Sequence, residues 1–336
     1  MPPRWIRRVV LAPLVVALSA LAVLLVPVWL LLAAVASPWI PGRWRPLRLL
    51  LFALAYLAIE SAALLAAFGI WLASGFGLRM GSPRFLAANY AVLAWQLRLL
   101  VAVARRAFNL RIHGREPFAA EAPLPGPLVV LSRHAGPGDS FLLVNWLLND
   151  EGRRPRIVLK DTMQWEPAID VFLHRVPSRF ISPNPAHGQD VAAAIGEMAA
   201  TMGREDALVI FPEGGNFTAR RRTRSIAKLE EKGLHAEADQ ARAMRNVMAP
   251  RPRGTIAAID AAPSAAAVFV AHTGLEELSA PVDLWRGLPM DSEVRAHAWL
   301  ADRAQLPDSG EGLERWLYAW WARIDDWISA EKADPG

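Results

Sequence analysis

No cysteine occurs among the 336 residues of the chain, so disulfide bridges and thiolate metal sites are excluded. The sequence also lacks a G-x4-G-K-[ST] phosphate-binding loop and an H-E-x-x-H zinc helix. Its seven histidines are scattered without the spacing of metal ligands. The sequence therefore predicts no metal centre and no phosphate-binding loop of this type.

Charged residues are missing from two long apolar segments near the N-terminus. Residues 9–36 carry no charge, and residues 49–73 carry only Glu60. About 20 apolar residues cross the core of a bilayer. The segments therefore predict two membrane helices or a re-entrant hairpin, and Pro13 and Pro27 favour bending of the first. A cleaved signal peptide is the alternative for residues 9–36. Glu60 is either functional or paired with a neighbouring helix.

Arginines flank both apolar segments on every side. They are Arg4, Arg7, Arg8, Arg43, Arg45, Arg48, Arg79 and Arg84. Positive charge marks the cytoplasmic side of a membrane, and either topology returns the chain to the side where it began. We therefore expect the C-terminal domain on the cytoplasmic face of the inner or plasma membrane. An anionic membrane accounts for the net charge of +5, and no nucleic acid is expected as a partner.

The apolar pattern divides the chain into three parts. Residues 1–84 are expected to form a membrane helical hairpin. Residues 85–112 are expected to form a basic amphipathic helix at the membrane interface, with a helix packed on the following domain as the alternative. Residues 113–336 are expected to form that globular domain.

In the third part, short apolar runs alternate with helical stretches. Strands are expected at 127–132, 156–159, 179–182, 207–211 and 266–271, and helices at 141–148, 191–202 and 225–247. This alternation predicts an α/β fold, with a mostly parallel sheet flanked by helices and a site at the carboxyl ends of the strands. Four tryptophans between Trp316 and Trp327 are expected in the core or at a membrane interface.

Two loops that follow expected strands contain the residues suited to chemistry. Residues 132–140 read SRHAGPGDS, where the glycines and proline between His134 and Asp139 predict a turn. In such a turn the imidazole and the carboxylate can face one another, whereas a shared helix would separate them. Histidine titrates near neutral pH, so this pair can form a base. The second loop, FPEGG at 211–215, lets backbone amides approach a ligand closely.

With these motifs, residues 113–280 resemble the glycerophospholipid acyltransferases of the 1-acylglycerol-3-phosphate type. The first motif of that family is H-x4-D, here His134 and Asp139, and its third is F-P-E-G, here Phe211 to Gly214. The branch that the chain resembles most contains the lysocardiolipin and lysophosphatidylinositol acyltransferases. The features shared with it include Phe217-Thr218, Gly233-Leu234 and VMAPR at 247–251.

The resemblance implies transfer of a fatty acyl group from acyl-CoA or acyl carrier protein to the hydroxyl of a lysophospholipid such as lysophosphatidate, with no cofactor. His134 would be the base, and Asp139 would fix its tautomer. Glu213 and Gly214 would bind the acceptor, with Glu213 orienting its hydroxyl. Backbone amides at the turn of residues 136–138, or at the start of the next helix, would meet the oxyanion.

One position departs from the family pattern. The second family motif places an arginine after a Phe-Ile strand end for the phosphate of the acceptor, and Pro183 occupies that position here. Lys160, Arg179 or the cluster that begins at Arg220 is then expected to meet the phosphate. The departure also keeps a glycolipid acceptor, or a lipid-binding protein without turnover, as alternatives. A serine hydrolase is disfavoured because the chain lacks a G-x-S-x-G elbow.

Overall fold

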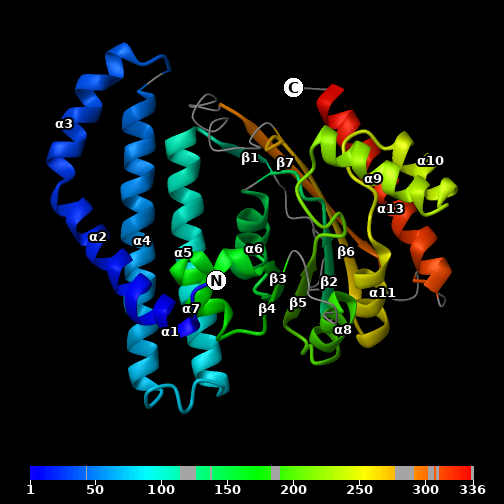
Figure 1. Cartoon of the computed structure of the whole chain (residues 1–336), viewed down its shortest axis with the longest axis horizontal. Coiled ribbons are helices and arrows are strands. Elements are labelled where there is room, and N and C mark those ends of the chain that lie inside the picture. The colour runs from blue at the N-terminus through cyan, green and yellow to red at the C-terminus, as the bar shows by residue number, and fades with distance from the viewer. Residues whose placement is uncertain are drawn as a thin grey trace.

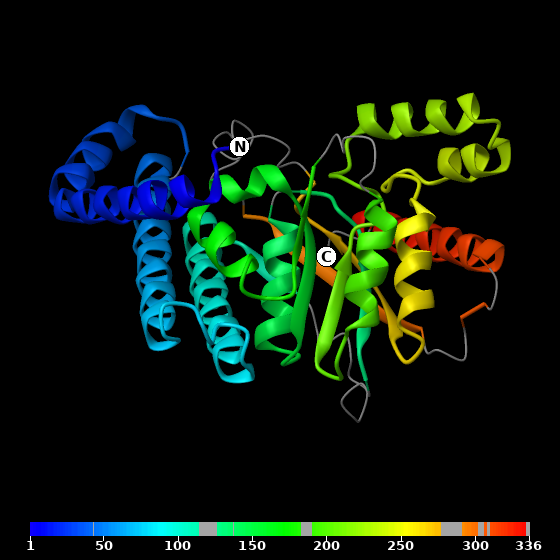
Figure 2. The same cartoon turned by 60° about the horizontal axis from the view of Figure 1, so that its bottom comes forward.

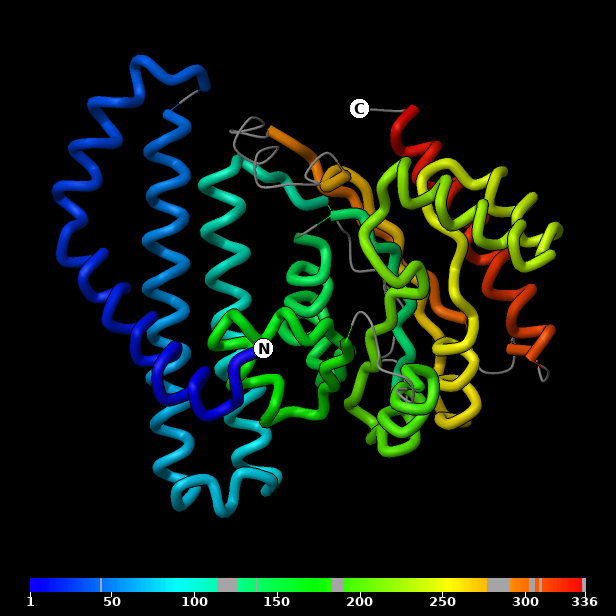
Figure 3. Tube along the Cα trace, in the orientation of Figure 1, coloured from blue at the N-terminus to red at the C-terminus, as the bar shows by residue number. Residues whose placement is uncertain are grey.

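The computed structural model of the chain describes residues 1–42, 44–113, 126–136, 138–182, 190–276, 291–301, 306–307 and 310–333. Long N-terminal helices stand beside a domain built on a central sheet (Figure 1). The tube in Figure 3 follows the same path, with the N-terminal helices on one flank and the C-terminal helix on the other. This arrangement confirms the expected α/β class with apolar helices at the N-terminus.

The N-terminal part contains three helices that are apolar and long enough to cross a membrane within the described residues. The first runs from Arg4 to Leu24 through α1 (Arg4–Ile6), η1 (Arg7–Leu11) and α2 (Ala12–Leu24). It is followed by α3 (Val26–Ala36) and the short η2 (Ser37–Trp39). The other two are α4 (Arg45–Ala73) and α5 (Pro83–Phe108). The sequence predicted two membrane segments, and α5 is the third candidate.

The break between α2 and α3 lies where the sequence favours bending. Leu25 leaves the helical region, with φ −88° and ψ 9°, and Pro27 stands in the first turn of α3. Proline removes a backbone donor and its ring clashes with the preceding turn. The first apolar segment is therefore two helices joined at an angle, and both contact α4.

Helix α5 packs between α4 and α6 (Asp139–Asn149), which belongs to the sheet domain. The Tyr90 hydroxyl donates to the Pro155 carbonyl at 3.1 Å, and Arg98 Nη2 donates to Asn149 Oδ1 at 2.6 Å. Asn149 Nδ2 in turn donates to the Ala94 carbonyl at 2.9 Å. Of the two alternatives for residues 85–112, these contacts support the helix packed on the domain.

Glu60 lies in the middle of α4 and is paired. Only 2% of it is exposed. One carboxylate oxygen accepts from the Ala168 amide at 2.9 Å, at the start of α7 (Pro167–Leu173), and the other accepts from Gln96 of α5 at 3.0 Å. A carboxylate beside the first amides of a helix satisfies donors that have no partner inside that helix. Glu60 therefore joins α4 to α5 and α7.

The sheet has seven strands in the order β1-β7-β6-β2-β5-β3-β4 within the described residues. Their bounds are β1 (Arg111–His113), β2 (Leu128–Ser132), β3 (Arg154–Lys160), β4 (Arg179–Ile181), β5 (Asp206–Ile210), β6 (Ala266–Thr273) and β7 (Glu293–Ala301). Neighbours run parallel except β6 and β7. All five expected strands are present. The pattern did not predict β1, which has three residues, or β7, whose sequence EVRAHAWLA mixes charged and apolar residues.

Helices cover both faces of the sheet, as Figure 2 shows. On one face, α6 packs Leu143 and Leu147 against Val130 of β2. The other face is covered by α8 (Val191–Ala200), α11 (Pro252–Ala261) and α13 (Gly310–Ala333). All five residues of β2 are buried because they face helices on both sides. The strands before the two predicted motif loops are therefore held in the core.

Two further sequence predictions are resolved on the α13 face. The helix expected over 225–247 is wrong, because Gly233 has φ +72° and separates α9 (Ala219–Glu231) from α10 (His235–Ala243). The tryptophans of α13 pack in the core: Trp321 is fully buried, and the Trp320 ring stacks on Phe269 at 4.3 Å between centroids.

Candidate active site

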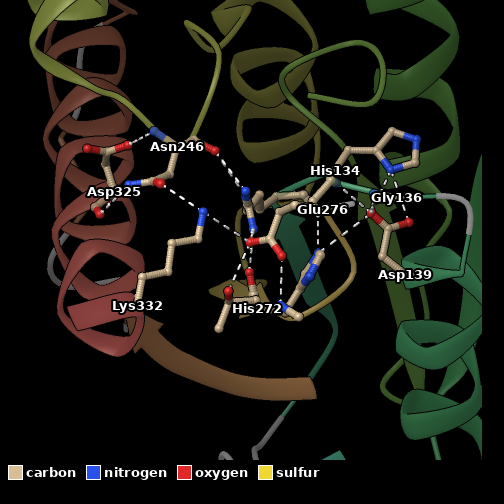
Figure 4. A network of polar contacts seen from close by, with 12 residues as sticks. His134, Gly136, Asp139, Asn246, His272, Glu276, Asp325 and Lys332 are labelled. Carbon is tan, nitrogen blue, oxygen red and sulfur yellow. Dashed lines mark hydrogen bonds and ion pairs between the residues drawn. The ribbon is translucent and has the colours of Figure 1, made fainter. Parts of the chain in front are cut away.

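His134 and Asp139 meet across the turn between β2 and α6. His134 Nδ1 lies 2.9 Å from Asp139 Oδ2 and 3.0 Å from Oδ1, as Figure 4 shows. Because Nδ1 faces a carboxylate, it carries the proton of the neutral ring, and Nε2 is left with the lone pair. The His134 side chain is 19% exposed. The pair therefore has the geometry of a general base whose reactive nitrogen is accessible.

The Asp139 carboxylate receives further donors from its own turn. Oδ2 accepts from the amides of Ala135 at 2.7 Å and Gly136 at 3.2 Å, and Oδ1 accepts from the Ser140 hydroxyl at 3.1 Å. Burial alone would raise the pKa of Asp139, but hydrogen bonds from His134 and His272 outweigh it and hold the pKa below its usual range. Asp139 is the first residue of α6, and among the described residues the backbone amides that donate to its carboxylate, those of Ala135 and Gly136, lie outside that helix. Its carboxylate therefore serves the turn and the imidazole.

Glu213 in the FPEGG loop is 2% exposed, and both its oxygens bond to backbone. Oε1 accepts from the His134 amide at 3.1 Å, and Oε2 accepts from the Met248 amide at 3.0 Å. Burial raises the pKa of Glu213 to about 8, against the opposing effect of these two bonds. The side chain therefore fixes the main chain of His134. The predicted contact with the acceptor hydroxyl has no support in this geometry, because both oxygens face the protein.

The loop also contacts the His134 ring and the segment after it. The Phe211 ring lies 4.4 Å from the imidazole between centroids, and the Phe217 amide donates to the His134 carbonyl at 2.6 Å. The carboxyl end of β5 is thus joined to that of β2 by side-chain and backbone contacts. As the parallel sheet predicts, the two motif loops form one site.

The glycines of this loop make room for two arginines: Arg221, from the arginine cluster that the sequence offered for the phosphate, and Arg251, which the sequence did not predict there. A Cβ on Gly214, which has φ +70°, would lie 2.8 Å from the guanidinium carbon of Arg251. A Cβ on Gly215 would lie 3.1 Å from Arg221 Nη1. The Arg251 amide donates to the Pro212 carbonyl at 2.9 Å, which holds this arginine beside the loop. Two guanidinium groups therefore lie against the FPEGG backbone, next to the His134 loop.

The structure places the other predicted binding residues at the surface. Lys160 ends β3 and is exposed, as is Arg220 in the first turn of α9. Arg179 is exposed and pairs with Glu197 at 2.8 Å. Within the described part of the chain, no hydrogen bond or ion pair joins these three to the His134–Asp139 pair. Pro183, at the second-motif position, lies outside the described residues.

A buried polar network that the sequence did not predict lies behind the pair. Arg133 is fully buried, and its Nη1 donates to the His272 carbonyl at 2.6 Å and to Glu276 Oε1 at 2.8 Å. His272 Nε2 lies 3.6 Å from Asp139 Oδ2. The sequence signal that could have drawn attention to Arg133 is the position of this arginine directly before His134. His272 is distant in sequence, and only the pairing of β6 with β2 brings it there.

Comparisons with known proteins agree with this geometry. Residues 109–251, which include both motif loops, match the protein-family model described as Acyltransferase. The crystal structure of the 1-acyl-sn-glycerophosphate (LPA) acyltransferase PlsC from Thermotoga maritima matches with a TM-score of 0.54 at 13% sequence identity. The match covers 85% of this chain and 98% of that chain, so the two share a fold. No curated protein sequence matches. Residues 109–251 thus form an acyltransferase domain by their match to the family model, and the chain shares its fold with a 1-acyl-sn-glycerophosphate acyltransferase.

Proposed function

We propose that the chain is a membrane-bound O-acyltransferase that transfers a fatty acyl group from acyl-CoA or acyl carrier protein to a lysophospholipid such as lysophosphatidate. The observation that carries the proposal is the His134 imidazole held by Asp139 through Nδ1, with Nε2 left as the base. The family domain and the adjoining apolar helices support the same function. No cofactor is required for this reaction.

The proposed reaction needs one base that acts twice. His134 Nε2 takes the proton of the acceptor hydroxyl as its oxygen attacks the thioester carbonyl carbon. The tetrahedral intermediate then expels the thiolate by breaking the carbon–sulfur bond, and the thiolate takes the proton from Nε2. The products are an ester and a free thiol. Asp139 stays ionised throughout and stabilises the imidazolium that forms between the two steps.

Donors for the oxyanion come from the start of α6. The amide of Gly136, which the turn offered as a donor, is already bonded to Asp139, as is the neighbouring amide of Ala135. Pro137 has no N–H, so it cannot donate. The first amides of α6 have no acceptor inside the helix. They also lie at the positive end of the helix dipole, which stabilises a negative charge. These amides are the donors that we propose for the oxyanion.

The acceptor phosphate is proposed to bind Arg251 and Arg221, the two guanidinium groups against the FPEGG glycines. Arginine binds phosphate oxygens through paired N–H donors. The Arg251 side chain is exposed and has no hydrogen-bond or ion-pair partner among the described residues. It is therefore available to a ligand. Arg179, in contrast, is already paired with Glu197.

Arg251→Ala is expected to raise the KM for lysophosphatidate about 10- to 100-fold, because a hydrogen bond to a charged group contributes about 1.5–3 kcal/mol. The KM for acyl-CoA should change little. Steady-state kinetics with each substrate varied in turn measures both. Arg220→Ala is the matched control, because Arg220 is an exposed arginine of the first turn of α9. An unchanged KM in Arg251→Ala, with a raised KM in Arg220→Ala or Lys160→Ala, would move the phosphate site to those residues.

The function itself is tested with recombinant membranes supplied with acyl-CoA and a panel of lysophospholipids. Release of free thiol, together with a new diacyl product seen by mass spectrometry, is the expected result. His134→Ala should abolish both, because it removes Nε2, the proposed base. Full activity in His134→Ala would remove the mechanism. Binding of lysolipid with no thiol release by the intact protein would favour a protein without turnover.

One contact of the N-terminal helix supports a proposal for the side of the membrane on which the domain lies. The N-terminal helix is joined to α7 by Arg7 Nη2, which lies 2.7 Å from the Asp170 carboxylate, and Asp170 is 1% exposed. The arginine-rich N-terminus therefore lies on the same side as the sheet domain. Since positive charge favours the cytoplasmic side, we place the catalytic domain on the cytoplasmic face of the inner or plasma membrane.

A further inference from the structure

A second imidazole contacts the carboxylate of the proposed catalytic pair. His272 is the seventh residue of β6, which pairs directly with β2, and it is 6% exposed. Its Nε2 lies 3.2 Å from the Arg133 carbonyl oxygen and 3.6 Å from Asp139 Oδ2. Both atoms are acceptors, so Nε2 carries a proton that points between them. The Asp139 carboxylate therefore contacts two imidazoles, as Figure 4 shows.

The contact from His272 differs from every other contact that Asp139 makes among the described residues. The other donors are His134, Ala135, Gly136 and Ser140, which all lie within five residues of Asp139 in the sequence. They hold the carboxylate within its own turn. His272 belongs to a different strand, so its contact ties the carboxylate itself directly to the sheet. A turn rich in glycine has little stiffness of its own, and such a tie limits its movement.

We propose that His272 is a positioning residue for acyl transfer, holding Asp139 so that the carboxylate keeps the His134 imidazole in its reactive orientation. The inference rests on the proposed function of His134 and Asp139. His272 does not touch the substrates. It acts through Asp139, and its removal should change turnover without changing the binding of either substrate.

The other nitrogen of His272 supports a specific role for this residue. Nδ1 is buried and has no hydrogen-bond partner among the described residues. An unpaired polar atom inside a protein costs about 1–3 kcal/mol, and a side chain chosen for packing alone would avoid that cost. The presence of an imidazole here is therefore explained by the N–H that Nε2 directs toward Asp139 and the Arg133 carbonyl. The main chain of His272 is also held in place, because Arg133 Nη1 donates to its carbonyl at 2.6 Å.

Among the described charged groups around the two imidazoles, Asp139 is the anion that contacts both. From the loop after β6, Glu276 pairs with Arg133 at 2.8 Å. Burial would raise the pKa of Glu276, but Arg133 outweighs it and brings the pKa to about 2, so this carboxylate is ionised. Lys332 of α13 lies 3.5 Å from the same carboxylate. Glu213 faces the His134 amide from the β5 loop. The Arg133 charge is therefore balanced by Glu276 and does not compete with the imidazoles.

Two variants of His272 test the proposal. His272→Phe keeps the ring volume and removes the donor, whereas His272→Gln places an amide N–H at a reach similar to that of Nε2. In His272→Phe we expect kcat to fall about 10- to 100-fold, the range found when partners that orient metal-binding side chains are removed. The KM for each substrate should be unchanged. His272→Gln should restore most of kcat.

The pH profile distinguishes positioning from a merely structural role. Once its His272 donor is lost, the Asp139 carboxylate interacts more strongly with protonated His134, which favours the inactive form of the base. The acid limb of the kcat profile should therefore move to higher pH in His272→Phe and return in His272→Gln. Thermal unfolding in detergent checks that each variant is folded. If the Phe variant does not fold, His272→Asn, whose amide is too short to reach Asp139, provides the same comparison.

Three results would overturn the inference. The first is wild-type kcat in His272→Phe or, in its place, His272→Asn. The second is an equal loss in the donor-free and Gln variants with the pH profile unmoved, which would show a structural role only. The third is a change confined to KM. Failure of the proposed function has a different signature, because His134→Ala would then remain active whatever His272 does.

Discussion

Asp139→Asn is expected to lower kcat about 10⁴-fold while leaving the chain folded, as removal of the carboxylate charge does in a Ser-His-Asp triad. The substitution keeps the size of the side chain but places an amide NH2 where the His134 ring meets it. The ring would then accept through Nδ1 and carry its proton on Nε2. In that tautomer the nitrogen that faces the substrates has no lone pair, so it cannot act as the base. Thiol release in steady state measures the loss.

Ser140→Ala is the matched control for Asp139→Asn. The Ser140 hydroxyl donates to Asp139 Oδ1 at 3.1 Å, yet His134 bonds to the carboxylate whether or not this donor is present. We expect a loss of only a few-fold, since about 1 kcal/mol of neutral hydrogen bonding is removed. An Asp139→Asn enzyme within tenfold of the wild type would show that another group orients the imidazole.

Glu213→Gln is expected to lower both stability and turnover. Both oxygens of Glu213 accept backbone N–H groups, from His134 and from Met248, and they can do so in either protonation state. The amide nitrogen of glutamine cannot accept, so one buried N–H loses its partner. This costs about 1–3 kcal/mol of unfolding free energy. If the His134 main chain shifts by about 1 Å, kcat should fall about 100-fold.

The same variant has a pH signature. The pKa of Glu213 is raised to about 8 by burial, so the folded chain binds a proton that the unfolded chain releases near pH 4.5. Its contribution to stability is therefore present below about pH 4.5 and is lost as the pH rises through about 8. Thermal unfolding measured across this range should show a flatter dependence in Glu213→Gln. The control is Glu197→Gln on the surface. A fully active, equally stable Glu213→Gln would exclude the role in holding the loop.

The sequence was sufficient to predict the proposed catalytic pair because the information is local. Two glycines and a proline between His134 and Asp139 exclude a continuous helix, and a turn brings the side chains together. Gly214 and Gly215 likewise marked the second loop. The direction of a side chain is not local, however. Nothing in the FPEGG stretch shows that Glu213 turns inward to His134 and Met248, because that depends on which strands are neighbours.

The missed elements have similar physical causes. The short β1 and the mixed β7 lack the continuous apolar run of a buried strand, so their pairing is visible only in the folded sheet. For helix α5 the sequence left two alternatives open, an interfacial helix and a helix packed on the domain, because its apolar face is interrupted by polar residues. Among these, Gln96 bonds to Glu60 of α4. Arg98 bonds to Asn149 at the end of α6. These two polar side chains therefore contact neighbouring protein helices.

Helix α5 is shared between the apolar helices and the sheet domain, and in the proposed function this would set the height of the reaction above the lipid. Its bonds to Asn149 hold one end of α6, and Asp139 starts the other end, about 15 Å away along that helix. The proposed base cannot rise or sink relative to the bilayer unless α5 moves with it. Bilayer thickness, rather than a mobile lid, would then control how far a lysolipid must lift its hydroxyl from the membrane to react.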